Sequence, residues 1–238
     1  MDSHVLLAIL LFCSAGAASS PEATSKSVRV GDAVTLPVTV PKGQRLTNLL
    51  LRDSVKKQAI AIWMESKDIT ILDIGYANRV TFQEDEMAFR IANLSLGDGT
   101  SYEISTSFSS PTPKLLSSFL VAVFNITKRV SSLRNDSCYI YLDCEAGMGH
   151  GQRVTYAWKD TEAGTTLSKA AWLTQLVHSN QRKAYTCTAQ TPTAQSAFSL
   201  VLQHSCLPNT ASPGPWALGS LLVRGLLVPT VAAALLLL

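Results

Sequence analysis

The order of cysteine, tryptophan and tyrosine in the second half of the chain leaves few folds open. Cys144 is followed by Trp158, and Cys187 closes the series with Tyr185 two residues before it. Residues 138–144 (CYIYLDC) alternate in polarity, which predicts a strand with one face in a core. A disulfide between two packed sheets, with a tryptophan against it and a tyrosine near the second cysteine, is typical of a two-layer β-sandwich. We therefore expect Trp158 and Tyr185 in the core of such a unit.

The spacing of these residues is similar to that of immunoglobulin domains, which are about 100 residues long. The chain has 238 residues, and its central part shows short alternating apolar runs separated by Gly, Pro, Asn and Asp. We expect an all-β protein of two tandem immunoglobulin-like β-sandwiches, variable-type and then constant-type. The expected boundaries are residues 19–124 for the first domain and 125–207 for the second. The junction, residues 124–128, contains no Gly or Pro, which predicts a semi-rigid connection.

The first residues are typical of a secretory signal. Residues 5–12 (VLLAILLF) are apolar and small residues follow them, which is the pattern of a signal peptide over residues 1–18. A core helix is the alternative, but the run lacks a polar face.

The last residues suggest an attachment signal for a glycosylphosphatidylinositol (GPI) anchor. Fourteen residues follow Arg224 without a charge, which suits the hydrophobic tail of such a signal. We expect spacer and signal to occupy residues 208–238. The candidate attachment residues are Asn209, Ser212 and Gly214. The alternative is a spanning helix that carries Arg224 and pairs with an acidic helix of another protein.

The cysteine count is typical of a disulfide framework. Cys13 leaves with the signal peptide, and four cysteines allow three pairings. The immunoglobulin pattern pairs Cys144 with Cys187, which leaves Cys138 for Cys206. A zinc site is the alternative, but the spacing between Cys138 and Cys144 is poor for a metal and the extracellular compartment is oxidising.

The first domain repeats the pattern without cysteines. Val38 and Ile104 stand where the two cysteines would be, and Tyr102 precedes Ile104 as Tyr185 precedes Cys187. In variable-type domains the position of Arg79 pairs with that of Asp98, so we expect an ion pair there. The alternative is that both are solvated loop charges.

A cysteine-free variable-type domain followed by a constant-type domain with two disulfides resembles the signalling lymphocytic activation molecule (SLAM) family. The resemblance covers about residues 22–207. It is most specific at Cys138, Cys144, Trp158, Tyr185, Cys187 and Cys206. The GPI tail looks like that of a GPI-anchored lymphocyte ligand in the family.

The third strand departs from the family pattern because residues 47–51 contain no tryptophan. Asn48 or Leu49 takes the usual tryptophan position, and Trp63 lies too far along the chain to do so. The register of this strand is therefore open by one residue, and a one-residue slip turns every side chain to the other face.

The resemblance implies that the first domain binds an immunoglobulin-type partner through the sheet of its third, fourth, sixth and seventh strands. If Tyr102 and Ile104 point inward, Glu103, Ser105 and Ser107 point outward. The remaining candidates for this partner-binding face are Arg52, Asp53, Lys56 and Lys57 at the end of the third strand, with Glu65, Lys67 and Asp68 on the next strand and its turn. The alternative is an ordinary solvated sheet face.

Three sequons for N-glycosylation are present, at Asn93, Asn125 and Asn135. We expect Asn93 before the tyrosine corner and away from the partner-binding face. We expect Asn125 at the domain junction.

Catalytic motifs are absent from the sequence. It has no G-x-S-x-G, H-E-x-x-H or Gly-rich phosphate loop, so we expect no enzyme, cofactor, metal or small-molecule substrate. The net charge of +3 is too weak for a nucleic-acid binder.

The resemblance implies a GPI-anchored glycoprotein on the cell surface, in part secreted. It would act as an adhesion or co-stimulatory ligand for a SLAM-family or related immunoglobulin-type receptor on leukocytes. The alternatives are a secreted or viral decoy of that receptor, and a single-pass receptor subunit that uses Arg224 to pair with an acidic adaptor helix. Homophilic and heterophilic binding both stay open.

Overall fold

The computed structural model describes residues 22–40, 42–43, 46–65, 67–106, 113–133, 136–149, 151–204 and 206. The predicted signal peptide and attachment signal lie outside these residues. So do the candidates Ser107, Asn135, Asn209, Ser212 and Gly214.

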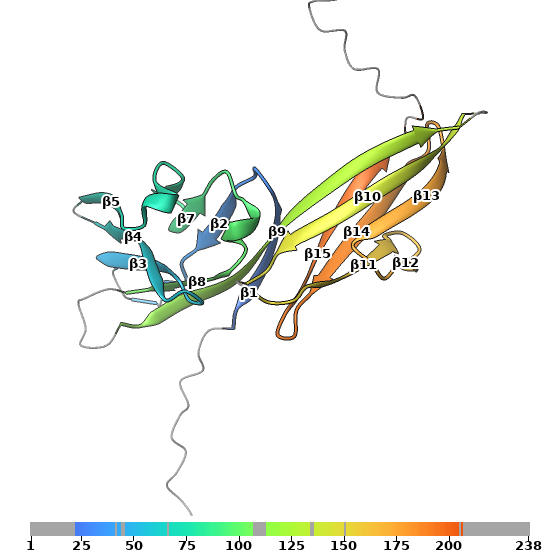
Figure 1. Cartoon of the computed structure of the whole chain (residues 1–238). Helices are drawn as coiled ribbons and strands as arrows, with labels where there is room; N and C mark the ends of the chain where they lie inside the picture. The colour runs from blue at the N-terminus through green and yellow to red at the C-terminus, as the bar shows by residue number, and fades with distance from the viewer. Residues whose placement is uncertain are drawn as a thin grey trace, which may run out of the picture.

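The described chain is built almost entirely of strands (Figure 1). The first half contains β1 (Thr24–Arg29), β2 (Val34–Pro37), β3 (Asn48–Asp53), β4 (Gln58–Met64), β5 (Lys67–Ile71), β6 (Val80–Gln83), β7 (Ala88–Ile91) and β8 (Ser101–Ser105), with 3-10 turns η1 (Ile74–Tyr76) and η2 (Leu96–Asp98). The second half contains β10 (Ser137–Gly147), β11 (Thr155–Asp160), β12 (Thr166–Ser168), β13 (Trp172–His178), β14 (Arg182–Gln190) and β15 (Gln195–Gln203). Between them lies β9 (Leu115–Ser132).

The strands form two tandem immunoglobulin-like β-sandwiches. In the first, β9, β8, β3, β4 and β5 form one sheet, with β1 parallel to β9, and β2, β7 and β6 form the other. In the second, β9, β10 and β13 form one sheet, and β12, β11, β14 and β15 form the other. The predicted fold class is confirmed.

Strand β9 belongs to both sandwiches. It runs for 18 residues without interruption, pairing with β8 in the first sandwich and with β10 in the second. Val123 packs in the first core, whereas Phe124 packs in the second. The expected boundary at residues 124/125 therefore falls inside a single strand.

The first core settles the register of β3. Leu49 and Leu51 are fully buried, so these side chains and not Asn48 face the core. Trp63 on β4 stands directly opposite Leu49, and its ring packs 4.5 Å from that of Phe82. Leu49, one of the two residues expected there, therefore takes the position on the third strand, and Trp63 joins the same core from the neighbouring strand. The Nε1–H of Trp63 donates to Glu84 Oε1 at 3.2 Å.

The positions expected for the missing cysteines lie in the same core. Val38 and Ile104 are both buried there. Their burial agrees with the expectation that aliphatic side chains replace the disulfide of this sandwich.

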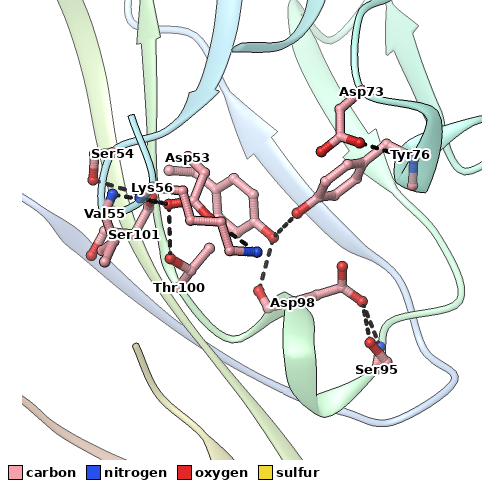
Figure 2. A network of polar contacts seen from close by, with 12 residues as sticks. Asp53, Ser54, Val55, Lys56, Asp73, Tyr76, Ser95, Asp98, Thr100 and Ser101 are labelled. Atoms are coloured by element: carbon pink, nitrogen blue, oxygen red, sulfur yellow. Dashed lines mark hydrogen bonds and ion pairs between the residues drawn. The ribbon is translucent and has the colours of Figure 1, made fainter. Parts of the chain in front are cut away.

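A network of polar contacts, several of them buried, lies within the first sandwich (Figure 2). The hydroxyl of Tyr102 donates to the carbonyl oxygen of Asp98 at 2.8 Å and lies 3.2 Å from the hydroxyl of Tyr76. This is the geometry of a tyrosine corner. Burial is the main cause that raises the pKa of Tyr102 far above its usual value, so this hydroxyl stays protonated and can donate.

Asp98 has a second role in the network. Its Oδ2 accepts from Arg79 Nη2 at 2.6 Å and from the backbone N–H and hydroxyl of Ser95 at 2.7 and 2.8 Å. The structure thus brings Arg79 and Asp98 together as an ion pair, with the carboxylate almost fully buried.

The second core contains both disulfides. Cys144 is bonded to Cys187 and Cys138 to Cys206. Trp158 lies opposite Cys187 on the adjacent strand and is fully buried. Its Nε1–H donates to the carbonyl oxygen of Ala171 at 2.8 Å.

Tyr185 is buried in the second core as expected. Its hydroxyl contacts a side chain, His204 Nε2, at 3.3 Å. Burial raises the pKa of Tyr185 to about 12 and lowers that of His204. The imidazole is therefore kept neutral in the folded protein.

Candidate partner-binding face of the first sandwich

The sheet formed by β8, β3 and β4 has one side in the first core and the other turned away from it. Side chains alternate along each strand, and β3 fixes the parity because Leu49 and Leu51 are buried. Residues directly opposite each other on antiparallel strands point to the same side of the sheet. The residues of β4 and β8 that lie opposite outward residues of β3 therefore point outward too. The front face, as we call it, consists of Asn48, Leu50, Arg52, Ile62, Met64, Ser101, Glu103 and Ser105.

The centre of the front face is apolar. Leu50 on β3 lies directly opposite Ile62 on β4, and Met64 lies two residues further along β4. All three are partly exposed and none belongs to the first core. Sequence reasoning missed them because the register of β3 was open. With Leu49 inward, period two would have placed Leu50 outward.

A charged pair stands beside this apolar centre. Arg52 and Glu103 are directly opposite each other on β3 and β8, with Arg52 Nε 3.6 Å from Glu103 Oε2. The distance is too long for a hydrogen bond, and both side chains are about one-third exposed. Such a pair contributes only about 0–1 kcal/mol to stability, so both charges remain usable for recognition.

Asp53 does not belong to the front face, which corrects the prediction. It is only 2% exposed, because it continues the inward series of Leu49 and Leu51. Its Oδ1 accepts from the backbone N–H groups of Val55 and Lys56 at 2.9 Å and from Thr100 Oγ1 at 3.1 Å (Figure 2). Asp53 therefore holds the turn after β3 rather than a partner.

Ser105 is a second correction. It has the outward parity that the alternation predicted, but it is only 7% exposed. Its register partners are Leu50 on β3 and Leu115 on β9, and the pairing with β9 shifts between Ile104 and Ser105. A small side chain paired with two leucines and buried to this extent offers little surface to a partner.

The other candidates surround the sheet. Lys56 and Lys57 are exposed in the turn after β3, where Lys56 Nζ lies 4.0 Å from Asp53 Oδ2. Glu65 is exposed after the end of β4, whereas Lys67 and Asp68 lie on β5 and not on β4.

The described sequons lie on different parts of the molecule. Asn93 is exposed between β7 and η2 and has a positive φ of 51°, which Asn tolerates better than most residues. Asn125 lies on β9, opposite Glu145 of β10.

The described residues contain no group of three or more His, Cys, Asp or Glu side chains arranged to hold a metal ion. Across the same residues, no helix has the length and apolar character needed to span a bilayer.

Comparison with curated proteins finds two lymphocyte relatives. SLAM family member 5 of Mus musculus is 22% identical over 185 residues, covering 74% of this chain and 54% of the relative. T-lymphocyte surface antigen Ly-9 of Homo sapiens is 26% identical over 225 residues, covering 89% of this chain and 34% of the relative. The chain thus spans about half and about one-third of the two relatives. No family model matches the chain.

Comparison with solved structures finds immunoglobulin-type domains. The CD2-binding domain of CD58 has a TM-score of 0.40 and 16% identity, covering 77% of this chain and 99% of that one. The first Ig-like domain from human CD48 antigen has a TM-score of 0.39 and 16% identity, covering 50% of this chain and 98% of that one.

By their names, one relative is a member of the SLAM family and the other is a surface antigen of T lymphocytes. Together with the order of the cysteines and the tandem β-sandwich topology, they show that the chain is related to the SLAM family.

Proposed function

We propose that the protein is an adhesion or co-stimulatory ligand that binds a SLAM-family or related immunoglobulin-type receptor on leukocytes through the front face. The observation that supports this most is the apolar centre of Leu50, Ile62 and Met64 on an otherwise polar sheet. Protein–protein interfaces commonly have an apolar core and a polar rim, and a few central residues carry most of the affinity.

The charges around the centre would give the face its selectivity. Arg52 and Glu103 present both signs side by side, and Lys56 and Lys57 add positive charge at one edge. Complementary charge on a receptor speeds association and excludes wrong partners more than it adds affinity.

Binding is tested with the full chain displayed on mammalian cells and purified ectodomains of SLAM-family receptors, including the chain itself as a possible homophilic partner. We expect at least one family ectodomain to bind. Binding by none of them, while the displayed chain keeps both disulfides, would overturn the proposed function.

We further propose that the protein is a glycoprotein held at the cell surface by a GPI anchor attached at Asn209, Ser212 or Gly214. Treating expressing cells with a phosphatidylinositol-specific phospholipase tests the anchor. Release supports it. Persistence supports a spanning helix that carries Arg224, and abundant protein in the medium of untreated cells supports a secreted decoy.

A further inference from the structure

The outer face of the second sandwich carries a group of exposed apolar side chains that the proposed function does not use. Tyr139 and Tyr141 on β10 are each more than one-third exposed, Leu176 on β13 is 53% exposed, and Trp172 on β13 is 66% exposed. These four residues are called the aromatic strip below.

The strip is contiguous by register. Tyr139 lies directly opposite Leu176, and Tyr141 lies opposite Thr174, two residues from Trp172. The residues of β10 that lie between the two tyrosines and after them, Ile140 and Leu142, point the other way and are buried in the second core. Single exposed apolar residues are ordinary, but adjacent ones usually mark a surface that something covers.

The same sheet face carries the sequon asparagine at residue 125. Asn125 on β9 pairs with Glu145 on β10, and Glu145 has the outward parity of Tyr139 and Tyr141. Thr127, the third residue of the sequon, pairs with Asp143, and Asp143 pairs on its other side with Trp172. The sequon and the strip are therefore neighbours on one continuous surface. Figure 1 shows β9, β10 and β13 running together along this sandwich.

The separations suit an oligosaccharide. Neighbouring strands lie about 4.8 Å apart and successive residues rise about 3.4 Å, which places the Asn125 and Trp172 backbones roughly 12 Å apart and those of Asn125 and Tyr141 roughly 14 Å apart. A branched chain of several sugar rings reaches across such a span.

The chemistry of the face also fits a sugar. Carbon-bound hydrogens on one side of a pyranose ring carry partial positive charge and pack on the negative face of an aromatic ring. The hydroxyl groups need donors and acceptors, and Arg129, Asp143 and Thr174 lie exposed among the aromatic residues.

We propose that Asn125 carries an N-linked glycan that folds back along the outer face of the second sandwich and covers the aromatic strip. The glycan then acts as part of the domain surface, shielding Trp172, Tyr141 and Tyr139 from water and from other proteins. This proposal is independent of the front face and of receptor binding.

A double-mutant cycle tests the proposal on the full chain produced in mammalian cells. Glycopeptide mass spectrometry first reads the occupancy of Asn125. Asn125→Gln is then combined with Trp172→Ser, and thermal unfolding of the second sandwich is followed for all four proteins. We expect Asn125→Gln alone to lower Tm by about 3–5 °C, and by less than about 1 °C in the Trp172→Ser background.

A matched control removes a different glycan. Asn93→Asp abolishes the sequon of the first sandwich and keeps a residue that tolerates positive φ. Its effect on Tm should be the same with and without Trp172→Ser.

Enzymatic removal of glycans from the folded protein gives a second readout that does not depend on expression of the variant. We expect acrylamide quenching of tryptophan fluorescence to rise in the wild type and to stay unchanged in Trp172→Phe. Equal Tm losses in both backgrounds, unchanged quenching or an unmodified Asn125 would each overturn the proposal. A glycosylated dimer that Trp172→Ser dissociates would assign the strip to a second copy instead.

Discussion

The buried tyrosines of the two cores, Tyr102 and Tyr185, form hydrogen bonds with different kinds of group. Tyr102 donates to a backbone carbonyl, that of Asp98, whereas Tyr185 contacts the imidazole of His204. The sequence pattern Tyr-x-Cys or Tyr-x-Ile placed both rings in a core, since the pattern is local. It did not give their partners, because those depend on how distant loops close over the hydroxyl groups.

Tyr102→Phe should lower the free energy of unfolding by about 1–3 kcal/mol, because the carbonyl of Asp98 and the hydroxyl of Tyr76 lose a buried partner. Chemical denaturation measures the change. Tyr141→Phe is the control, with N-linked glycans removed from all the proteins compared: its hydroxyl then lies on an exposed ring, and its loss should change stability by less than about 0.5 kcal/mol. Equal effects of the two changes would contradict the buried network.

His204 should make stability fall as the pH drops below the ordinary histidine pKa of about 6.5. Burial first, and then Lys128 and Lys183, lower its pKa in the folded protein. Between the lowered value and about pH 6.5 the unfolded chain binds a proton that the folded chain does not, so the free energy of unfolding rises with pH in that window. The slope is at most about 1.4 kcal/mol per pH unit for one proton.

Denaturation between pH 5 and 7 measures this slope. His204→Gln should reduce it, whereas His178→Gln, which alters an exposed histidine on β13, should leave it unchanged. A slope that survives His204→Gln would show that another group is responsible.

For individual strands, the sequence predicted which side chains alternate between the core and the solvent. Residues 138–144 alternate as predicted, with Ile140 and Leu142 buried. The pairing between strands could not be read in the same way. Trp63 reaches the core because the pairing of β3 with β4 shifts between Leu51 and Arg52, and such a shift leaves no mark in the residue pattern.

The same limit explains the two errors on the front face. Asp53 is a charged residue, so its sequence alone suggested that it faces solvent. It instead points inward, where its carboxylate accepts hydrogen bonds from backbone N–H groups of the following turn. Ser105 has the outward parity but is buried, with leucines as its partners on both neighbouring strands. In both cases the neighbours that decide exposure come from other parts of the chain.

The turn at η2 and the end of β10 approach each other so closely that side chains would not fit. A Cβ on Gly147 would overlap the backbone of Leu96, and one on Gly99 would overlap that of Gly147. Gly147→Ala should therefore destabilise the junction, by about 1–3 kcal/mol for an overpacked site. Gly97→Ala is the control, because its nearest neighbour, Ser95 Oγ, is at an ordinary 3.6 Å.

Differential scanning calorimetry distinguishes the two variants. Gly147→Ala should shift the unfolding transition to lower temperature, and Gly97→Ala should leave it nearly unchanged. The same Tm for Gly147→Ala and the wild type would contradict the close approach.

Over the whole molecule, the two sandwiches are joined by more than one connection. The continuous strand β9 is the first. Gly149 N donates to the carbonyl oxygen of Gly99 at 2.7 Å, and the hydroxyl groups of Ser27 and Ser196 lie 2.6 Å apart. The absence of Gly and Pro from residues 124–128 predicted a semi-rigid connection, but it did not reveal that one strand serves both units.

We expect these connections to restrain the angle between the front face and the second sandwich. For the proposed ligand, a restrained junction would set its orientation before it meets a receptor on another cell and so reduce the entropy lost on binding. In the proposed function, the front face is the surface that meets the receptor.

The most direct test compares two charge substitutions on the full chain displayed on cells. Leu50→Asp places a carboxylate at the apolar centre of the front face, and Val201→Asp does the same at a 56% exposed position on β15 of the second sandwich. The displayed chains are titrated with the SLAM-family ectodomain that the wild type binds. Leu50→Asp should bind it at least about tenfold more weakly, and Val201→Asp should bind it with unchanged affinity. Unchanged affinity for Leu50→Asp, with the chain folded, would contradict the account.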